Sequence, residues 1–280
     1  MLSMSNTRGW AVDAAVRRCL SVDSKRAIVR STRSVSCTLT YAPVMVSVII
    51  GAVLKSTSGI GMPFVTIPAI SYVASIEEAV AVGALPNLML NLALAWAQRE
   101  QWSATRDLAR LSAFAFVGGA AGTFLLVSLP SKPLIALLIL VVLAYVVLKV
   151  ASPEFSVGAA ASHRWAPLVG TSAGVMQGAV GISGPIVVSW IQSLRLERAA
   201  QILAVTVMFA VAGISQFPVL VGTGELTGLW IITLVACIPT LATIPLGSRI
   251  RARLSLAAFD RFVLALLVLS TVGLAWRTFL

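Results

Sequence analysis

Two glycine–proline motifs interrupt long apolar segments of this chain: G-I-G-M-P at residues 59–63 and G-I-S-G-P at residues 181–185, about 122 positions apart. Glycine lets the backbone turn without a side-chain clash, and proline suits the first turn of a helix, so each motif predicts a break followed by a short helix. The first N–H groups of such a helix lack carbonyl partners, and its dipole adds about half a positive charge there. Two helices that start near Met62 and Gly184 could therefore bind a small oxyanion between them.

Polar side chains close to the breaks are candidates for the same site. Lys55 is the one basic residue well inside an apolar run, and Gln177 is its counterpart 122 positions later. Asn87 and Asn91 are four residues apart, hence on one helical face, in the apolar stretch that follows the first motif. We predict that the substrate-binding residues are Lys55, Ser56, Thr57, Ser58, Gly59, Gly61, Met62, Asn87, Asn91, Gln177, Gly181, Ser183 and Gly184.

A structural role is the alternative for each of these residues. Glycine and proline also kink membrane helices or let two helices pack closely. The Lys55 side chain could instead extend to a membrane interface, and the two asparagines could form an interhelical hydrogen bond that serves packing alone. The presence of two matched breaks favours a substrate site over packing.

The composition predicts that lipid covers much of the chain. Of the 280 residues, 58% are hydrophobic and 11% are charged, and the mean hydropathy is +0.95, which is too apolar for a water-soluble core. Six apolar stretches are near the ~20 residues that a spanning helix needs, and two longer segments, 43–75 and 166–194, contain the breaks. The six stretches are 78–97, 107–128, 132–150, 198–220, 226–247 and 258–279. The expected fold class is therefore an all-α, multi-pass membrane protein.

The net charge of +11 is better explained by membrane topology than by nucleic-acid binding. Basic residues concentrate in residues 1–42 and in the loops between apolar stretches, as the positive-inside rule expects. The tail of residues 1–42 contains no apolar run, and we expect it to be disordered. The three cysteines show no paired spacing, so neither a disulfide framework nor a metal site is expected.

The two breaks belong to a predicted internal repeat. Shifting the chain by 122 positions aligns Gly59 with Gly181 and Pro63 with Pro185. Three uninterrupted apolar stretches follow each broken element. We therefore expect a basic tail, a first transmembrane repeat, a linker and a second transmembrane repeat, at residues 1–42, 43–148, 149–165 and 166–280 respectively.

The positions of the basic loops favour inverted repeats. These loops all face the cytoplasm if segment 166–194 enters and leaves the membrane on one side and turns at residues 181–184. Such a hairpin needs two arms of about 12 residues each. By symmetry, segment 43–75 would be a hairpin that enters from outside. That arrangement puts the basic tail outside, against the same rule, and a spanning segment 43–75 without strict symmetry is the alternative.

These stretches resemble the sulfite exporter TauE/SafE family, whose repeated signature is a glycine-rich break, a proline-containing half-helix and an alanine-rich span. The matching stretches are G-A-V-L-K-S-T-S-G-I-G-M-P-F-V-T-I-P from Gly51 to Pro68, E-E-A-V-A-V-G from Glu77, G-V-M-Q-G-A-V-G-I-S-G-P from Gly174 to Pro185, and E-R-A-A-Q from Glu197. The chain departs from the signature at Met62 and Pro63, where a further glycine is usual.

The resemblance covers about residues 43–278 and implies a secondary transporter rather than an enzyme. The implied substrate is sulfite, an organosulfonate or a related sulfur-containing organic anion, usually moved outward across the bacterial inner membrane. The implied partners are this small anion and the lipid bilayer. A coupling ion, either proton or sodium, and a homodimer stay open. No resident cofactor, metal or nucleic-acid partner is expected.

Four other functions have different sequence requirements. An anion channel can also be built from two hairpins. An intramembrane serine protease would use Ser183 as its nucleophile, which needs a base; the only histidine, His163, precedes the serine in a hydrophilic linker. A metal transporter needs clusters of histidine, cysteine or carboxylate within the spans, and an ATP-driven pump needs a phosphate-binding loop. The sequence has neither feature.

Overall fold

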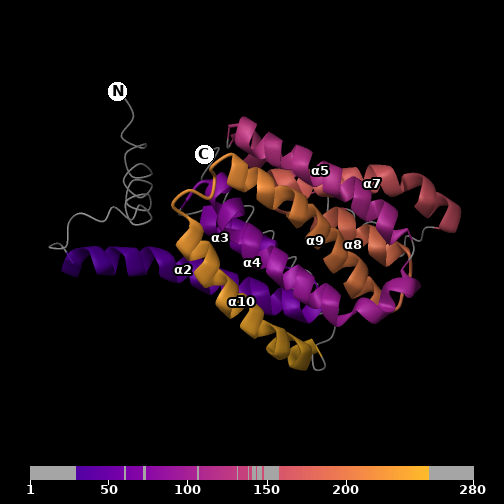
Figure 1. Cartoon of the computed structure of the whole chain (residues 1–280), viewed down its shortest axis with the longest axis horizontal. Helices are drawn as coiled ribbons and strands as arrows, with labels where there is room; N and C mark the ends of the chain where they lie inside the picture. The colour runs from indigo at the N-terminus through magenta and orange to yellow at the C-terminus, as the bar shows by residue number, and fades with distance from the viewer. Residues whose placement is uncertain are drawn as a thin grey trace.

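A computed structural model describes residues 30–251, apart from 60, 72–73, 106, 131, 138, 141–142, 144–146 and 148–157. Within these residues every regular element is a helix, so the predicted all-helical fold is confirmed there (Figure 1). The elements are α2 (Arg30–Ser58), α3 (Met62–Ser71), α4 (Ile76–Ala97), η1 (Arg99–Ala104), α5 (Leu108–Ser128), α7 (Ala159–Val180), α8 (Gly184–Ser193), α9 (Arg198–Gly222) and α10 (Trp230–Arg251).

Four of the described helices are long and apolar enough to cross a membrane: α4, α5, α9 and residues 230–247 of α10. Their lengths of 18 to 25 residues match the ~20 that a crossing needs. They coincide with four of the six predicted spans and define a multi-pass membrane protein. Of the other two, 132–150 is described only in part and 258–279 lies outside the described residues.

The two broken segments differ from the hairpins predicted from the sequence. Each joins a long helix to a short one: α2 has 29 residues and α3 has 10, while α7 has 22 and α8 has 10. The prediction of two equal arms is therefore wrong. The long arms start early, α2 at Arg30 within the expected tail and α7 at Ala159 within the expected linker. Residues 159–166 contain neither glycine nor proline, so nothing stops the α7 helix there.

Both long helices end at a glycine in the left-handed backbone conformation. Gly59 has φ +83° and donates its N–H to the Lys55 carbonyl at 2.7 Å. Gly181 has φ +70° and donates its N–H to the Gln177 carbonyl at 2.9 Å. A residue with a side chain adopts this conformation at a cost of roughly 1–2 kcal/mol. The predicted glycine turns are thus confirmed at both breaks. In both, the glycine N–H donates to the carbonyl four residues earlier.

Corresponding helices in the two halves start 122 residues apart. The three pairs of starts are Met62 and Gly184, Ile76 and Arg198, and Leu108 and Trp230. After each break the chain therefore forms a short helix followed by two long ones at the same spacing.

Helices α5 and α7, which come from different halves, run parallel and in contact (Figure 1). Ser162 in the first turns of α7 donates a hydrogen bond to Asp107, the residue before α5, at 2.7 Å. Farther along both helices, Gly119 of α5 lies against Gly178 of α7. The two helices thus start at the same end of the bundle.

A second contact between the halves joins α10 of the second half to α2 of the first half. Ala236 of α10 packs in one buried cluster with Val48 and Ala52 of α2. Farther along, the hydroxyl oxygens of Ser56 and Thr243 are 3.0 Å apart. These helices are also parallel, so each half contributes one helix to a parallel pair with the other half.

Helices α4 and α9 pack together at the centre of the bundle. Leu88 near the middle of α4 lies against Gly213 in the second half of α9. The η1 helix, which follows α4, also contacts α9. If α4 and α9 were parallel, η1 would lie beyond the end of α9 at Gly222. The two helices therefore run in opposite directions, which places η1 beside the first half of α9.

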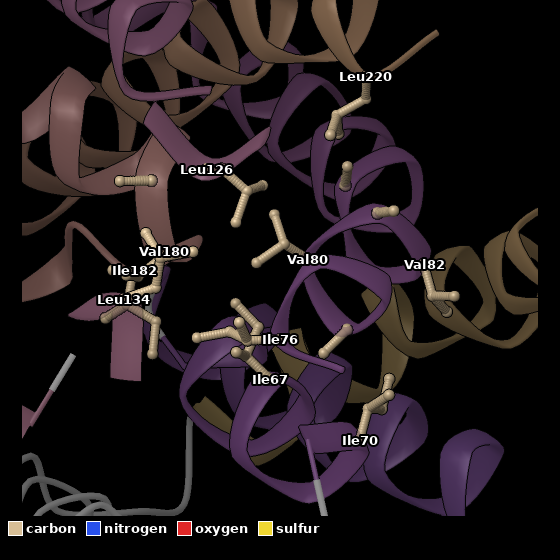
Figure 2. Close-up of a cluster of buried hydrophobic side chains, with 14 of the residues drawn as sticks. Ile67, Ile70, Ile76, Val80, Val82, Leu126, Leu134, Val180, Ile182 and Leu220 are labelled. Carbon is tan, nitrogen blue, oxygen red and sulfur yellow. The ribbon is translucent and has the colours of Figure 1, made fainter. Parts of the chain in front are cut away.

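A cluster of buried apolar side chains holds the second break against helices of the first half (Figure 2). Val180 and Ile182 flank the break and belong to one cluster with Ile67 of α3, Val80 of α4 and Leu126 of α5. Burial of these groups ties the turn after α7 to three elements that are distant in sequence.

Glycines form the contact between α5 and α7. A methyl group at Gly178 would overlap the backbone of Gly119 and Thr123, and one at Gly122 would overlap the backbone of Val175. Such close approach gives van der Waals contact between backbones, which is a main source of helix association in lipid. We call this contact the glycine seam; it consists of Gly118, Gly119, Gly122, Gly170, Gly174 and Gly178.

Gly178→Ala should lower the free energy of unfolding by about 1–3 kcal/mol, because the added methyl group has no space and forces α5 and α7 apart. Gly222→Ala is the matched control, since nothing lies within 4 Å of the added methyl group there. The measurement is the apparent melting temperature of the purified protein in detergent, followed by tryptophan fluorescence. Equal melting temperatures for the two variants would contradict the close packing of the seam.

Candidate functional site between the two helix breaks

Both short helices start where the sequence predicts, α3 at Met62 and α8 at Gly184. Pro63 and Pro185 each occupy the second helical position, where an N–H group would have no carbonyl partner in the helix. Helix geometry therefore leaves the N–H groups of the first residues, Met62 and Gly184, without carbonyl partners inside the helix, whereas the Ile186 N–H donates to the Ser183 carbonyl at 3.1 Å.

Two glycines beside the short helices serve different purposes. Gly61 connects α2 to α3 with φ +131°, a conformation that a side chain would strain. Gly184 is helical, and the ring of Phe64 fills the space that a side chain would take; a methyl group there would overlap the ring. The starts of α3 and α8 thus touch each other through Phe64 and Gly184.

A pocket of about 190 Å³ lies between the starts of the two short helices. Ser183 and Gly184 line it from the start of α8, and Gly61 and Pro63 line it from the start of α3. The two helix N-termini predicted to converge on a ligand therefore face one pocket. We call it the break pocket; its lining residues are Gly61, Pro63, Phe64, Gln177, Ile182, Ser183, Gly184 and Phe209.

A second pocket of about 260 Å³ adjoins the break pocket, because Pro63 and Gln177 line both. Its polar lining consists mainly of the side-chain amides of Asn87, Gln177 and Gln216. An amide supplies both hydrogen-bond donors and an acceptor without a full charge. We call it the amide pocket; its lining residues are Met62, Pro63, Thr66, Ile67, Val80, Gly83, Ala84, Asn87, Gln177, Gly181 and Gln216.

Lys55 is fully buried, with 0% of its surface exposed. Its Nζ atom donates a hydrogen bond to Asn87 Oδ1 at 2.8 Å and lies 4.5 Å from the centroid of the Phe209 ring. Asn87 lines the amide pocket and Phe209 lines the break pocket. The amine therefore contacts one lining residue of each pocket, although Lys55 itself lines neither. The alternative that Lys55 extends to a membrane interface is wrong in this structure.

Gln177 is fixed from both sides. Its Oε1 atom accepts a hydrogen bond from Ser183 Oγ at 3.0 Å, across the break. The Nε2 group of Gln216 on α9 donates to the carbonyls of Gln177 and Gly178 at 3.2 and 3.3 Å. These carbonyls belong to the last turn of α7, where helix geometry leaves acceptors without partners. Gln216 thus completes the end of α7 from a neighbouring helix.

Two predicted hydroxyl donors have partners elsewhere. Ser56 Oγ is 3.0 Å from Thr243 Oγ1 on α10, and Thr57 Oγ1 donates to the Val53 carbonyl of its own helix at 2.8 Å. Neither residue lines the break pocket or the amide pocket. The helix rotation near the end of α2 turns these hydroxyls away from the site, so the sequence prediction needs correction here.

Two further predicted residues, Gly59 and Asn91, are also absent from both pocket walls. Asn91 is fully buried, and its side-chain amide has no hydrogen-bond partner among the described residues. Gly59 faces α9, where a methyl group would meet Ile202 and Thr206. The side chain of Ser58 lies outside what the structure describes.

Phe209 and Gln216 are among the pocket residues that were not in the predicted set. Phe209, which lies under the Lys55 amine, is 122 residues after Asn87. The repeat spacing therefore pointed to this position, but an aromatic residue in an apolar stretch gives no other signal. Gln216 is a buried amide within the apolar α9 helix, which was the available indication. Its carbonyl partners could only be found from the packing of α9 on α7.

Among the described residues, Ser183 does not contact a general base, as the nucleophile of a serine protease would. Its hydroxyl donates to Gln177, and the Lys55 amine donates to Asn87 instead. His163 lies at the start of α7 and contacts Asp107. The rise of ~1.5 Å per residue puts it about 26 Å along α7 from the break.

The helical bundle defines a multi-pass membrane protein, and a pocket between two broken helices is typical of transporters. A protein-family model described as "Sulfite exporter TauE/SafE" matches residues 44–274. The chain belongs to this family, as the resemblance of its motifs predicted. Comparisons with curated proteins and with solved structures found no match.

Gln216→Met should lower the free energy of unfolding by about 1–3 kcal/mol, because methionine keeps the volume but removes the donor to the Gly178 carbonyl at the end of α7. Gln101→Met in the partly exposed η1 helix is the control. Thermal unfolding in detergent measures both variants. A Gln216 variant as stable as the control would show that the carbonyls gain little from this amide.

Proposed function

We propose that the protein is a secondary transporter that moves sulfite or an organosulfonate by alternating access, with its site between the two breaks. Membership in the TauE/SafE family supports a sulfur-containing anion as the substrate class. The observation that carries the proposal is that the N-terminal ends of α3 and α8 line one pocket beside the fully buried Lys55.

The charges around the break pocket favour an anion. Each short helix adds about half a positive charge at its start, and Lys55 adds a full charge when protonated. Neither α3 nor α8 contains an acidic residue. On the neighbouring α4 helix, Glu77 and Glu78 lie in the first turn, where they interact with the helix start. A positively polarised site of this kind attracts negative ligands.

Inverted repeats would give alternating access a structural basis. Support comes from the helix starts that are 122 residues apart, from the two parallel pairs between halves and from the opposite directions of α4 and α9. We place the repeats at residues 43–148 and 166–280, with the tail at 1–42 and the linker at 149–165. Rocking of one repeat against the other would open the pockets to one side of the membrane at a time.

The proposed location is the bacterial inner membrane. All described membrane-spanning segments are helices, whereas proteins of the bacterial outer membrane are built as β-barrels. The location also matches the export of anions that the family resemblance implies.

Reconstituted protein should give saturable sulfite uptake into liposomes, with faster exchange when unlabelled sulfite is present on the opposite side. Gly184→Val should reduce this flux at least about tenfold, because the valine side chain takes the space of the Phe64 ring and narrows the break pocket. Gly222→Val is the control. Wild-type flux in the Gly184 variant would place the site elsewhere, and flux without saturation or exchange would indicate a channel.

Ser183→Ala should raise the KM for sulfite by roughly two- to tenfold and leave transport measurable, since one hydrogen bond contributes about 0.5–1.5 kcal/mol. The fluxes are compared at equal amounts of monodisperse protein. A protease that used Ser183 as its nucleophile would lose all activity on the same substitution. Complete loss of transport with normal folding would contradict the modest role given to this hydroxyl.

A further inference from the structure

Lys55 is the one charged side chain that is buried in the described part of the chain. Its two contacts are the Asn87 side-chain oxygen and the face of the Phe209 ring. Both attract a positive charge through partial charges only. The amine therefore has a hydrogen-bond acceptor and an aromatic face but no carboxylate.

In the described part of the chain, the helices packed around Lys55 place no acidic side chain in contact with it. Helices α3 and α8 contain no charged residue. On α4, Glu78 is nine residues before Asn87, which is about 13 Å along the helix. On α9 the nearest charged residue to Phe209 is Arg198, at the helix start. On α2, α4, α9 and α10 the titratable residues with described side chains, besides Lys55, are Glu77, Glu78, Arg198, Cys237 and Arg249.

A protonated lysine without a counter-charge is unfavourable in a buried site, whereas a lysine next to an anion is not. None of the described residues that line the break pocket is charged. Its walls contribute only the partial positive charges at the starts of α3 and α8. Among the described residues none places a carboxylate beside the amine, so the transported anion is the counter-charge that we infer. The charge on Lys55 and the occupancy of the pocket are therefore coupled.

We propose that Lys55 takes up one proton with each anion and gives it up when the anion leaves, so that the protein moves an anion and a proton together. The inference rests on the proposed function above. In the loaded state the ammonium faces the anion and the two charges cancel. After release on the far side, the proton leaves to water, the amine is neutral, and the empty site returns without a buried charge.

The second half of the chain supports a single proton per cycle. The residue 122 positions after Lys55 is Gln177, which lines both pockets and has no titratable group. The two sides of the site are thus alike in geometry but differ in charge. A monoanion and one proton make the transport step electrically neutral.

Methanesulfonate is the probe for the test, because it stays a monoanion throughout the working pH range, whereas sulfite itself binds protons near neutral pH. Wild-type protein in liposomes should take up methanesulfonate with one proton per anion and without net current. A pH-sensitive dye inside the liposomes and an electrical recording measure the two quantities. If sulfite is transported and methanesulfonate is not, uptake of sulfite without current is the supporting result.

Lys55→Arg separates loading from return. Arginine stays protonated, so net uptake by this variant should fall at least about tenfold relative to its own rate of anion exchange, because the empty site must return with a buried charge. Lys132→Arg, at an exposed lysine, should change neither rate. Wild-type proton counting does not depend on the folding of any variant.

Two results would overturn the inference and leave the proposed function intact: net uptake that carries one charge per anion without protons, or wild-type net uptake by Lys55→Arg. A different result would overturn both. If wild-type protein exchanges neither sulfite nor methanesulfonate, the proposed function fails and the proton-coupled step fails with it.

Discussion

A helix that breaks inside a bilayer frees backbone polar groups that lipid cannot satisfy, so the protein itself must provide their partners. This requirement explains the arrangement around both breaks. At the carboxyl ends of α2 and α7, Gly59 and Gly181 fold back onto carbonyls of the preceding turn, and Gln216 reaches α7 from α9. At the amino ends of α3 and α8 prolines remove one donor each, and residues from both ends line the break pocket. The proposed binding site therefore lies where the breaks interrupt the backbone hydrogen bonds.

The glycine seam determines which helices of the bundle are held together as a pair. Because α5 and α7 approach at backbone contact, they form a rigid pair although they come from different halves of the chain. Helices α2 and α10 form the second pair, with α2 from the first half and α10 from the second half. Each broken element is therefore held by a long helix of the opposite half, while the short helices α3 and α8 meet through Phe64 and Gly184. Relative motion between these bodies acts directly on the pocket walls.

Local chemistry made the breaks and the starts of α3 and α8 predictable, since glycine turns and proline at a helix start depend on a few neighbouring residues. The family was also predictable from the same motifs. The early starts of α2 and α7 were not, because polar residues that read as tail or linker can continue a helix beyond the apolar stretch. The rotation of Ser56 and Thr57 away from the site and the contribution of Phe209 depend on how α2, α9 and α10 pack, which a single sequence does not encode locally.

The exchange of helices between halves has a consequence for how such a chain came to exist. Under the proposed inverted repeat, a chain with only the first half would leave the seam face of α5 uncovered, and a second copy inserted in the opposite orientation would have to cover it with its α7-like helix. One short gene would then have to produce both orientations, which requires loops with nearly balanced charge. Fusion of two copies removes that requirement. Each half can then acquire its own orientation signal and its own side chains at equivalent positions, as with lysine at 55 and glutamine at 177.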